Sequence, residues 1–186
     1  MSKNVLVPLA EGFEEIEAVT IVDILRRAGA TVTTAGLHKR NVTGSHGISI
    51  IADSVIQEEI DKEWDLVALP GGIPGAQNLA ENEDVVTLIQ KTSAHKKFTA
   101  AVCAAPIVLE KAGVIKGKKV TSHPSVEKEI VTAFHQETRT LVDDKIITGQ
   151  ACGSAMEFAF ELVAVLCGEE KVKEMDKSIL SVNVKS

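Results

Sequence analysis

The sequence predicts an α/β fold in which a mostly parallel sheet carries helices on both faces. Short, continuous apolar runs such as Val5–Leu9 and Trp64–Leu69 are typical of strands that are covered on both sides. Amphipathic segments alternate with these runs, and glycine or proline stands at most of the junctions. With 186 residues, of which 45% are hydrophobic, the chain is long enough for one well-filled core. We therefore expect a single domain over residues 1–186.

The first half begins with a strand over Val5–Leu9, which Gly12 separates from an acidic segment. Glu14–Ala28 is expected to be a helix, because apolar residues recur at helical spacing, acids occupy its first turn and arginines its last. These apolar positions are Ile16, Val19, Val22 and Leu25. Thr31–Ala35 reads as a strand, and the glycines and β-branched residues of 41–52 indicate a short antiparallel excursion. The buried strand Trp64–Leu69 then ends at Pro70-Gly71-Gly72.

The second half continues the alternation of strands and helices. Its expected elements are a helix over Asp84–Ser93, a strand over Phe98–Val102, a helix over Pro106–Ala112, a strand over Lys119–Ser122, a strand pair over Thr140–Asp143 and Lys145–Thr148, and a helix over Ser154–Cys167. The sequence contains no repeat, linker or low-complexity tract.

Composition and charge exclude several classes of function. The net charge of −6 and the absence of a basic run make nucleic acid an improbable electrostatic partner. The apolar run near the N-terminus is too short for a signal-peptide core or a membrane span. The three cysteines are an odd number in a chain that can fold without disulfides, which favours a reducing compartment. These features predict a soluble, cytoplasmic protein with no membrane partner.

Cys103 stands at a predicted strand-to-helix turn, within the stretch AVCAA. A nucleophile flanked by small residues is the spacing of a nucleophile elbow, with alanine where glycine is commoner. A sulfur at a helix N-terminus should have an increased thiolate population and be both nucleophilic and oxidisable. The alternative is that Cys103 is a small apolar residue at a strand end, and the local sequence does not decide between the two.

The other cysteines leave a further alternative open. Cys152 also lies between a strand and a helix among small residues, so the local pattern does not exclude it as the reactive thiol. Cys167 ends an apolar helix and has no charged or histidine neighbour, which indicates core packing.

Residues after other strands could complete a site at the same edge of the sheet. Gly71 and Gly72 allow a substrate to approach the backbone, and the amides of Gly72 and Ala104 could hold an oxyanion, although two glycines also suit an ordinary turn. His123 follows a predicted strand and could lie near Cys103, or be incidental. The remaining histidines show no zinc-site spacing, and we expect no metal and no cofactor.

Three glutamates open the first helix, namely Glu14, Glu15 and Glu17. The helix dipole favours carboxylates at a helix N-terminus, and this alone explains the presence of any two of these glutamates. A carboxyl group beside a thiolate would have its ionisation suppressed and could serve as a proton shuttle. Composition does not indicate which glutamate does this.

Taken together, these motifs resemble the ThiJ/PfpI superfamily, most closely the branch of the parkinsonism-associated protein DJ-1. The resemblance covers nearly the whole chain and is carried by LAEGFEEIEAV, DILRRAGATVTTAGL, LPGGIPGAQNL, AVCAAP, SHP and GSAMEFAFELV. It implies a flavodoxin-like three-layer sandwich that forms a homodimer. It also implies a reactive Cys103, a protonated Glu17 against it, a nearby His123 and oxyanion amides at Gly72 and Ala104.

The sequence departs from the family pattern at two places. Cys152 stands where the family usually has proline, and Gln150 where it usually has arginine, so substrate preference and redox behaviour could differ. The protease-like branch has histidine directly after the cysteine, whereas this chain has Ala104, which weakens a peptidase interpretation.

The resemblance implies an enzyme that converts small reactive dicarbonyls, such as methylglyoxal, without a cofactor, as a glyoxalase or a deglycase, with a role in carbonyl and oxidative stress. A redox sensor or redox-regulated chaperone that acts through oxidation of Cys103 is the alternative. A binding or scaffold domain without chemistry is a third possibility, because a fold does not fix a function.

Overall fold

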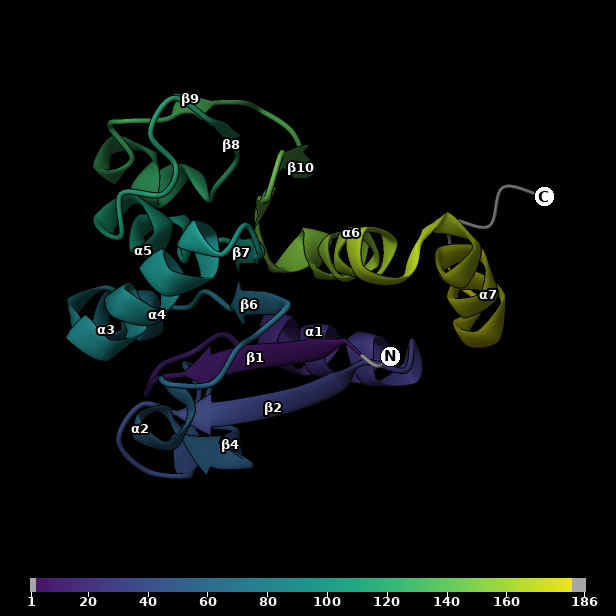
Figure 1. The fold of residues 1–186 in the computed structure, drawn as a ribbon, viewed down its shortest axis with the longest axis horizontal. Helices are drawn as coiled ribbons and strands as arrows, with labels where there is room; N and C mark the ends of the chain where they lie inside the picture. Colours follow the sequence, from purple (N-terminus) through teal and green to yellow (C-terminus); the bar gives the residue numbers. More distant parts are fainter. Residues whose placement is uncertain (1–2, 182–186) are drawn as a thin grey trace.

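A seven-stranded sheet forms the centre of the computed structural model, which describes residues 3–181 (Figure 1). In spatial order its strands are β10 (Thr140–Asp143), β11 (Ile146–Gly149), β7 (Phe98–Val102), β6 (Leu66–Leu69), β1 (Asn4–Leu9), β2 (Thr31–Gly36) and β5 (Ser54–Val55). All neighbouring pairs are parallel except β10 and β11. The predicted mostly parallel sheet is confirmed, as is the predicted strand pair, which forms its antiparallel edge.

Helices cover both faces of the sheet and give three layers. One face packs against α1 (Glu15–Arg27) and α6 (Ala155–Cys167), and α7 (Glu169–Ile179) continues outward from α6 (Figure 1). The other face packs against α2 (Ile56–Glu59), α3 (Gly75–Glu81), α4 (Glu83–Ala94) and α5 (Pro106–Lys111). No described helix is long and apolar enough to cross a membrane.

After the exposed Asn4, strand β1 is apolar because both of its faces are covered. Val5, Val7 and Leu9 belong to the core on the α1 side, and Leu6 belongs to the core on the opposite side. All four are at most 1% exposed. Burying each such side chain contributes about 1.5–3 kcal/mol, so a central parallel strand needs apolar residues at successive positions.

The buried face of α1 differs from the stripe that the spacing suggested. Ile16 and Val19 are 57% and 51% exposed, whereas Ala18 and Ile21 are buried. Glu17 is also buried, so the inward face of α1 begins with a carboxyl group. The exposed stripe of this amphipathic helix therefore contains large apolar side chains, which chain periodicity alone could not assign to a face.

The predicted strand over Lys119–Ser122 is placed differently in the structure. Only β8 (Lys119–Val120) is extended, and it pairs with β9 (Phe134–His135) in a separate two-stranded sheet. The alternation of strands and helices predicted that this segment belongs to the central sheet. That prediction is wrong, because β8 pairs only with β9 among the described strands. The predicted antiparallel excursion is confirmed as β3 (Asn41–Thr43) and β4 (Ser49–Ile51).

Several short elements had no counterpart in the expectations from sequence. They are α2, α3, α7, β5, β9 and the 3-10 helices η1 (Pro124–Glu129) and η2 (Cys152–Ser154). The helix α3 matters most for the site, because it begins directly after the Pro70–Pro74 loop and holds that loop at the carboxyl ends of the strands.

Candidate active site

Cys103 lies at the sharp turn between β7 and α5, in a strained backbone conformation. Its φ angle is +63°, in the left-handed region that residues with a side chain rarely adopt. Its amide donates to the carbonyl of Gly149 at 2.9 Å, and its own carbonyl accepts from the amide of His123 at 2.8 Å. Such strain costs about 1–3 kcal/mol and persists only where the surroundings hold it in place, as they do at many functional sites.

Two glycines allow the neighbouring loop to approach this turn. A Cβ atom at Gly71 would lie 2.8 Å from the Cβ of Cys103, closer than side chains tolerate. Gly72 has a φ of +90°, and a Cβ there would lie 2.5 Å from the amide nitrogen of Glu14. The two glycines are therefore required by close packing of three loops, which is a stronger constraint than the turn alone.

Glu17 is brought from the first turn of α1 into contact with both loops. Its side chain is completely buried, and its Oε2 accepts from the Gly71 amide at 2.7 Å. Its Oε1 is also buried and has no hydrogen-bond partner of standard geometry within residues 3–181. The neighbouring group is the Cys103 thiol, which interacts with the carboxyl group. The structure thus leaves one carboxyl oxygen of Glu17 available to the sulfur.

The Glu17 carboxyl group is poised to exchange a proton near neutral pH. Burial raises its pKa to about 7, and the negative charge of Glu14 acts in the same direction. The Gly71 amide and the Cys103 thiol oppose this shift, because they stabilise the carboxylate. The expectation that a thiolate charge suppresses the ionisation of Glu17 is therefore not met: burial raises the pKa, and the thiol lowers it.

The thiol of Cys103 behaves differently from the expectation for a helix N-terminus. Burial and the adjacent Glu17 carboxylate raise its pKa, while the amides of Ala104 and Gly72 partly oppose the rise by hydrogen bonding to the sulfur. The thiol therefore keeps its proton while Glu17 is ionised. The two groups form a coupled pair, and its titration steps belong to the pair and not to either residue.

His123 lies beside the cysteine through its backbone. Its amide contacts the Cys103 carbonyl, but its ring forms contacts with Ser125. Nδ1 accepts from the Ser125 amide at 3.2 Å, so the neutral ring carries its proton on Nε2. The residue is near Cys103 as expected, although the strand that was to place it there lies outside the central sheet.

The glycine and alanine amides divide into two roles. Gly71 was among the residues predicted to bind an oxyanion or the substrate. Its amide instead donates to the Glu17 carboxyl group and orients it. The amides of Gly72 and Ala104 both point at the sulfur and could receive an oxyanion formed there. The structure thus brings together Cys103, Glu17 and these amides, and leaves the His123 ring outside this contact set.

The three glutamates of α1, which sequence could not distinguish, have three different environments. Glu14 caps the helix, because its Oε2 accepts from the Glu17 amide at 2.8 Å. Glu15 is turned to the β3–β4 turn, where it contacts His46. The Glu17 side chain reaches the Gly71 amide and the Cys103 thiol, whereas Glu14 contacts Gly71 through its backbone amide. The role of Glu14 as a cap could have been recognised from its position before the helix, but the contact of Glu15 with His46 has no signal in the sequence.

All three cysteines are free thiols, with Cys103 partly buried and the other two exposed. Cys152 begins η2, directly after the loop that follows β11, and Cys167 ends α6. The expectation that Cys167 packs in the core is wrong, because its residue is exposed. No strain and no buried carboxyl contact accompanies either residue among the contacts that the structure describes.

A well-formed surface hollow lies away from Cys103. It is lined by residues that precede β6 and β7, including Trp64, His95 and Lys97, together with residues of α4. The amino ends of parallel strands lie at the opposite edge of the sheet from their carboxyl ends, where Cys103 follows β7. Chemistry and strain therefore identify the candidate site better than the size of a hollow.

Comparison with known proteins agrees with this arrangement. The model of the DJ-1/PfpI family matches residues 3–165. The chain is 41% identical to Protein DJ-1 homolog A of Arabidopsis thaliana over 179 residues, which are 95% of this chain and 46% of that protein. It thus spans about half the length of this relative. It is 31% identical to the Glutathione-independent glyoxalase DJR-1.2 of Caenorhabditis elegans over 180 residues, covering 96% of this chain and 95% of that protein.

Solved structures show the same fold. The structure of Drosophila melanogaster DJ-1beta has a TM-score of 0.94 at 38% identity and covers 97% of this chain and 98% of its own. The structure of oxidized Toxoplasma gondii DJ-1 also has a TM-score of 0.94, at 36% identity, covering 97% of this chain and all of its own. The fold is therefore flavodoxin-like, as the resemblance implied, and the chain belongs to the DJ-1/PfpI family.

Proposed function

We propose that this chain is a cofactor-independent enzyme that converts reactive dicarbonyls, methylglyoxal among them, into hydroxy acids through Cys103. The observation that carries the proposal is the strained Cys103 held against a buried Glu17 carboxyl group of raised pKa. The name of the Caenorhabditis elegans relative, a glyoxalase independent of glutathione, supports the same class of reaction. Cys103 offers a protein thiol in place of the thiol of glutathione.

The first step forms a carbon–sulfur bond to the aldehyde. Ionised Glu17 takes the thiol proton as the sulfur attacks, which gives a hemithioacetal oxyanion. The amides of Gly72 and Ala104 lie beside the sulfur and stabilise this oxyanion. The Gly71 amide keeps the Glu17 carboxyl group in place throughout. The reaction can begin only when the Cys103–Glu17 pair has already lost one proton.

The later steps move a proton from one carbon to the next. Glu17 returns its proton to the alkoxide, removes the proton from the former aldehyde carbon, and delivers it to the adjacent carbon, while the hydroxyl proton passes from the oxygen of the first carbon to the oxygen of the second. The first carbon is thereby oxidised to a thioester and the second is reduced to an alcohol. Water then cleaves the thioester and releases the thiol, so that methylglyoxal and water yield lactate with no external oxidant. His123, whose ring lies outside the contact set, is proposed to assist proton transfer to solvent.

Lactate formation by the purified protein tests this proposal. We expect conversion of methylglyoxal to lactate that is lost in Cys103→Ala and Glu17→Gln and kept in Cys152→Ala, the matched variant at an exposed thiol. No lactate from the wild-type chain, or equal rates in Cys103→Ala, would contradict it. Deglycation is tested separately by trapping free dicarbonyl, because removing the free compound also reverses early adducts by mass action.

A redox sensor or redox-regulated chaperone is the second candidate, and one observation favours it. The Gly72 and Ala104 amides that face the sulfur would equally bind the oxygens of a sulfinate. The related Toxoplasma gondii structure is described as oxidized. This candidate predicts no lactate, together with peroxide oxidation that mass spectrometry locates selectively on Cys103. Free thiols in all three cysteines suit the reducing cytoplasm under either function.

We further propose that two copies of the chain associate through the outer face of α1. Ile16 and Val19 are joined on this side by Ile51, which is 79% exposed. The hollow beside Val19 is lined by Asp23, Arg26 and Asp53 as well as by apolar residues, so the surface carries both charge signs and can pair with itself. Light scattering on the wild type and on Val19→Glu tests this: the account predicts a dimer and a monomer, respectively, and a monomeric wild type would refute it.

A further inference from the structure

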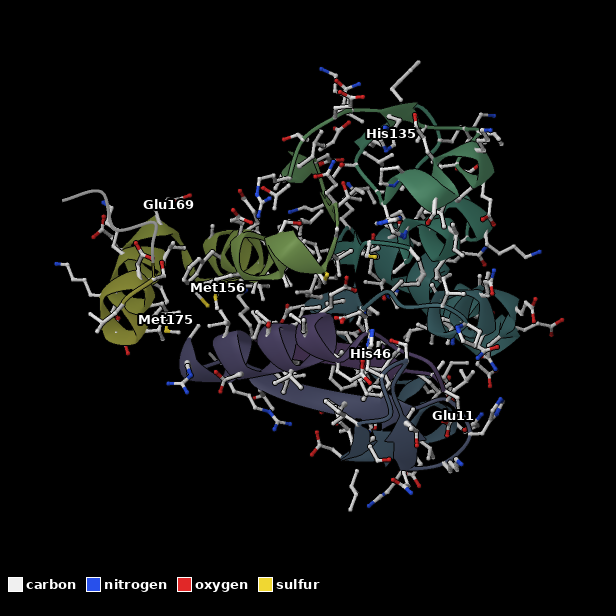
Figure 2. The ribbon with its side chains drawn as sticks, turned by 180° about the vertical axis from the view of Figure 1, so that it is seen from behind. Glu11, His46, His135, Met156, Glu169 and Met175 are labelled. Carbon is white, nitrogen blue, oxygen red and sulfur yellow. The ribbon has the colours of Figure 1, made fainter. Side chains whose placement is uncertain are left out.

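A second cluster of ionisable side chains lies at the amino end of α1, separate from the Cys103–Glu17 pair. Glu14, Glu15 and His46 each offer one potential ligand atom, and these atoms all lie within 4.8 Å of one another. The glutamates belong to the beginning of the helix, and His46 belongs to the turn between β3 and β4. Figure 2 shows His46 beside the amino end of α1. Two segments that are distant in sequence thus converge on one point.

The two carboxyl groups are buried, whereas the imidazole is accessible. The side chains of Glu14 and Glu15 are 10% and 5% exposed, and that of His46 is 71% exposed. His46 Nδ1 lies 2.9 Å from Glu15 Oε2 and 4.0 Å from Glu14 Oε1. Glu14 Oε2 is used in capping, but Oε1 has no hydrogen bond among residues 3–181 and points toward the imidazole. The Glu14 side chain is thus mostly buried, with one carboxyl oxygen free to accept a positive partner beside the imidazole.

Glu15 is held in the orientation that a ligand would need. The amides of His46 and Ile48 donate to its Oε1 at 2.7 and 3.3 Å, and its Oε2 faces the imidazole and accepts from the Ser45 hydroxyl at 3.4 Å. A Cβ atom at Gly44 would lie 2.3 Å from Glu15 Oε1, and the absence of a side chain there makes room for the carboxyl group. The turn that carries His46 is therefore shaped around Glu15.

We propose that Glu14, Glu15 and His46 bind a divalent transition-metal ion of the zinc class. One imidazole nitrogen and two carboxylate oxygens are typical ligands of Zn²⁺, and three protein ligands leave a position for water. Ligand distances of about 2.0–2.2 Å require the three atoms to lie about 3–3.5 Å apart, so the 4.0 Å contact between His46 and Glu14 must shorten by about 0.5–1 Å. The exposed His46 side chain can make this adjustment, and the two carboxylate oxygens, which lie within 4.8 Å of each other, must reach the same spacing when the ion binds. The imidazole makes Ca²⁺ or Mg²⁺ a poorer match, because both prefer oxygen ligands.

Cobalt(II) titration tests the site in the Cys103→Ala chain, where the active-site thiol cannot act as a ligand. We expect one equivalent of Co²⁺ to produce a visible d–d absorption without a sulfur charge-transfer band, and Zn²⁺ to displace it. Glu14→Gln and His46→Gln should weaken binding at least tenfold. His38→Gln is the matched control, because His38 is also exposed but lies outside the cluster, and it should leave binding unchanged.

Two further features keep the experiment decisive. Glu14→Gln retains an oxygen that can accept from the Glu17 amide, so the helix cap survives, and circular dichroism verifies the fold. Gly44→Ala should also weaken binding, although it removes no ligand, because it displaces Glu15. The proposal is overturned if Co²⁺ does not bind saturably, or if it binds His46→Gln as tightly as the parent chain. Neither result depends on dicarbonyl turnover, so the proposed enzymatic function stands or falls separately.

Discussion

Glu15 and Glu17 lie two residues apart in the first turn of α1, and both are buried, yet their carboxyl groups have opposite properties. Burial works against ionisation of Glu15, but hydrogen bonds from the His46 side chain and from the His46 and Ile48 amides outweigh it and lower the pKa to about 2. Glu17 has one amide donor and a like charge nearby, so burial dominates and raises the pKa to about 7. The number of donors, and not burial alone, decides which carboxyl group holds a proton.

The largest expected effect comes from Glu17, the proton carrier of the proposed reaction. Glu17→Gln keeps the size and burial of the side chain but cannot accept the thiol proton, so lactate formation should fall by about 10²–10⁴-fold. Steady-state assays of purified protein measure this, with Glu81→Gln as a control at an exposed glutamate of α3. A variant rate within threefold of the wild type would remove Glu17 from the mechanism.

The second-largest effect is expected in the loop that contains Gly72. Gly72→Ala places a Cβ atom 2.5 Å from the Glu14 amide at a φ of +90°, so it should destabilise the fold by about 2 kcal/mol or more. It should also displace one oxyanion amide and reduce turnover. Gly153→Ala is the matched control, since a Cβ there meets no neighbour within 4 Å and its φ lies outside the left-handed region. Denaturant unfolding curves of equal stability for the two variants would contradict the packing described.

The pH dependence of stability should separate the two glutamates by sign. Because the folded pKa of Glu15 is lowered, its contribution is present above its unfolded pKa of 4.5 and is lost as pH falls toward 2. Because the folded pKa of Glu17 is raised, its contribution is present below 4.5 and is lost as pH rises through about 7. Glu15→Gln should therefore cost stability at pH 7, and progressively less as pH falls from 4.5 toward 2, whereas Glu17→Gln should gain stability relative to the wild type between pH 5 and 8.

Urea unfolding at a series of pH values measures both differences. The prediction for Glu15 requires the wild-type and Glu15→Gln curves to converge in acid. If the two glutamine variants shift stability in the same direction at every pH, the contrast between the two carboxyl environments is wrong.

The smallest expected effect is at His123, whose ring contacts Ser125 and not the reacting pair. His123→Ala should lower lactate formation by only a few fold and leave the pH profile unchanged. A loss as large as that of Glu17→Gln would show that the histidine, and not the glutamate, carries the proton.

Sequence reasoning located the site more reliably than it assigned roles within it. The elbow at Cys103 and the glycine loop follow strands whose buried, continuous apolar runs are hard to mistake, so their proximity could be predicted. The place of Lys119–Val120 could not, because a two-residue strand has no periodicity to show which sheet it joins. The inward face of α1 was also hidden, because a carboxyl group occupies it while Ile16 and Val19 face outward. The pairing of Glu15 with His46 depends on a turn more than thirty residues away and left no local signal.

The thiol illustrates the same limit in energetic terms. A helix N-terminus favours thiolate, and that reasoning from local structure was sound. The structure adds burial and the facing Glu17, which act in the opposite direction and arise from segments distant in sequence.

The central claim is that Glu17 and Cys103 share a proton and that the pair must lose one proton before it reacts. The pH dependence of kcat/KM for methylglyoxal tests this most directly. The account predicts that wild-type kcat/KM rises with pH through an apparent pKa near 7, and that this inflection is missing from the residual activity of Glu17→Gln. The same inflection in both proteins, or a wild-type rate that falls as pH rises through 7, would contradict it.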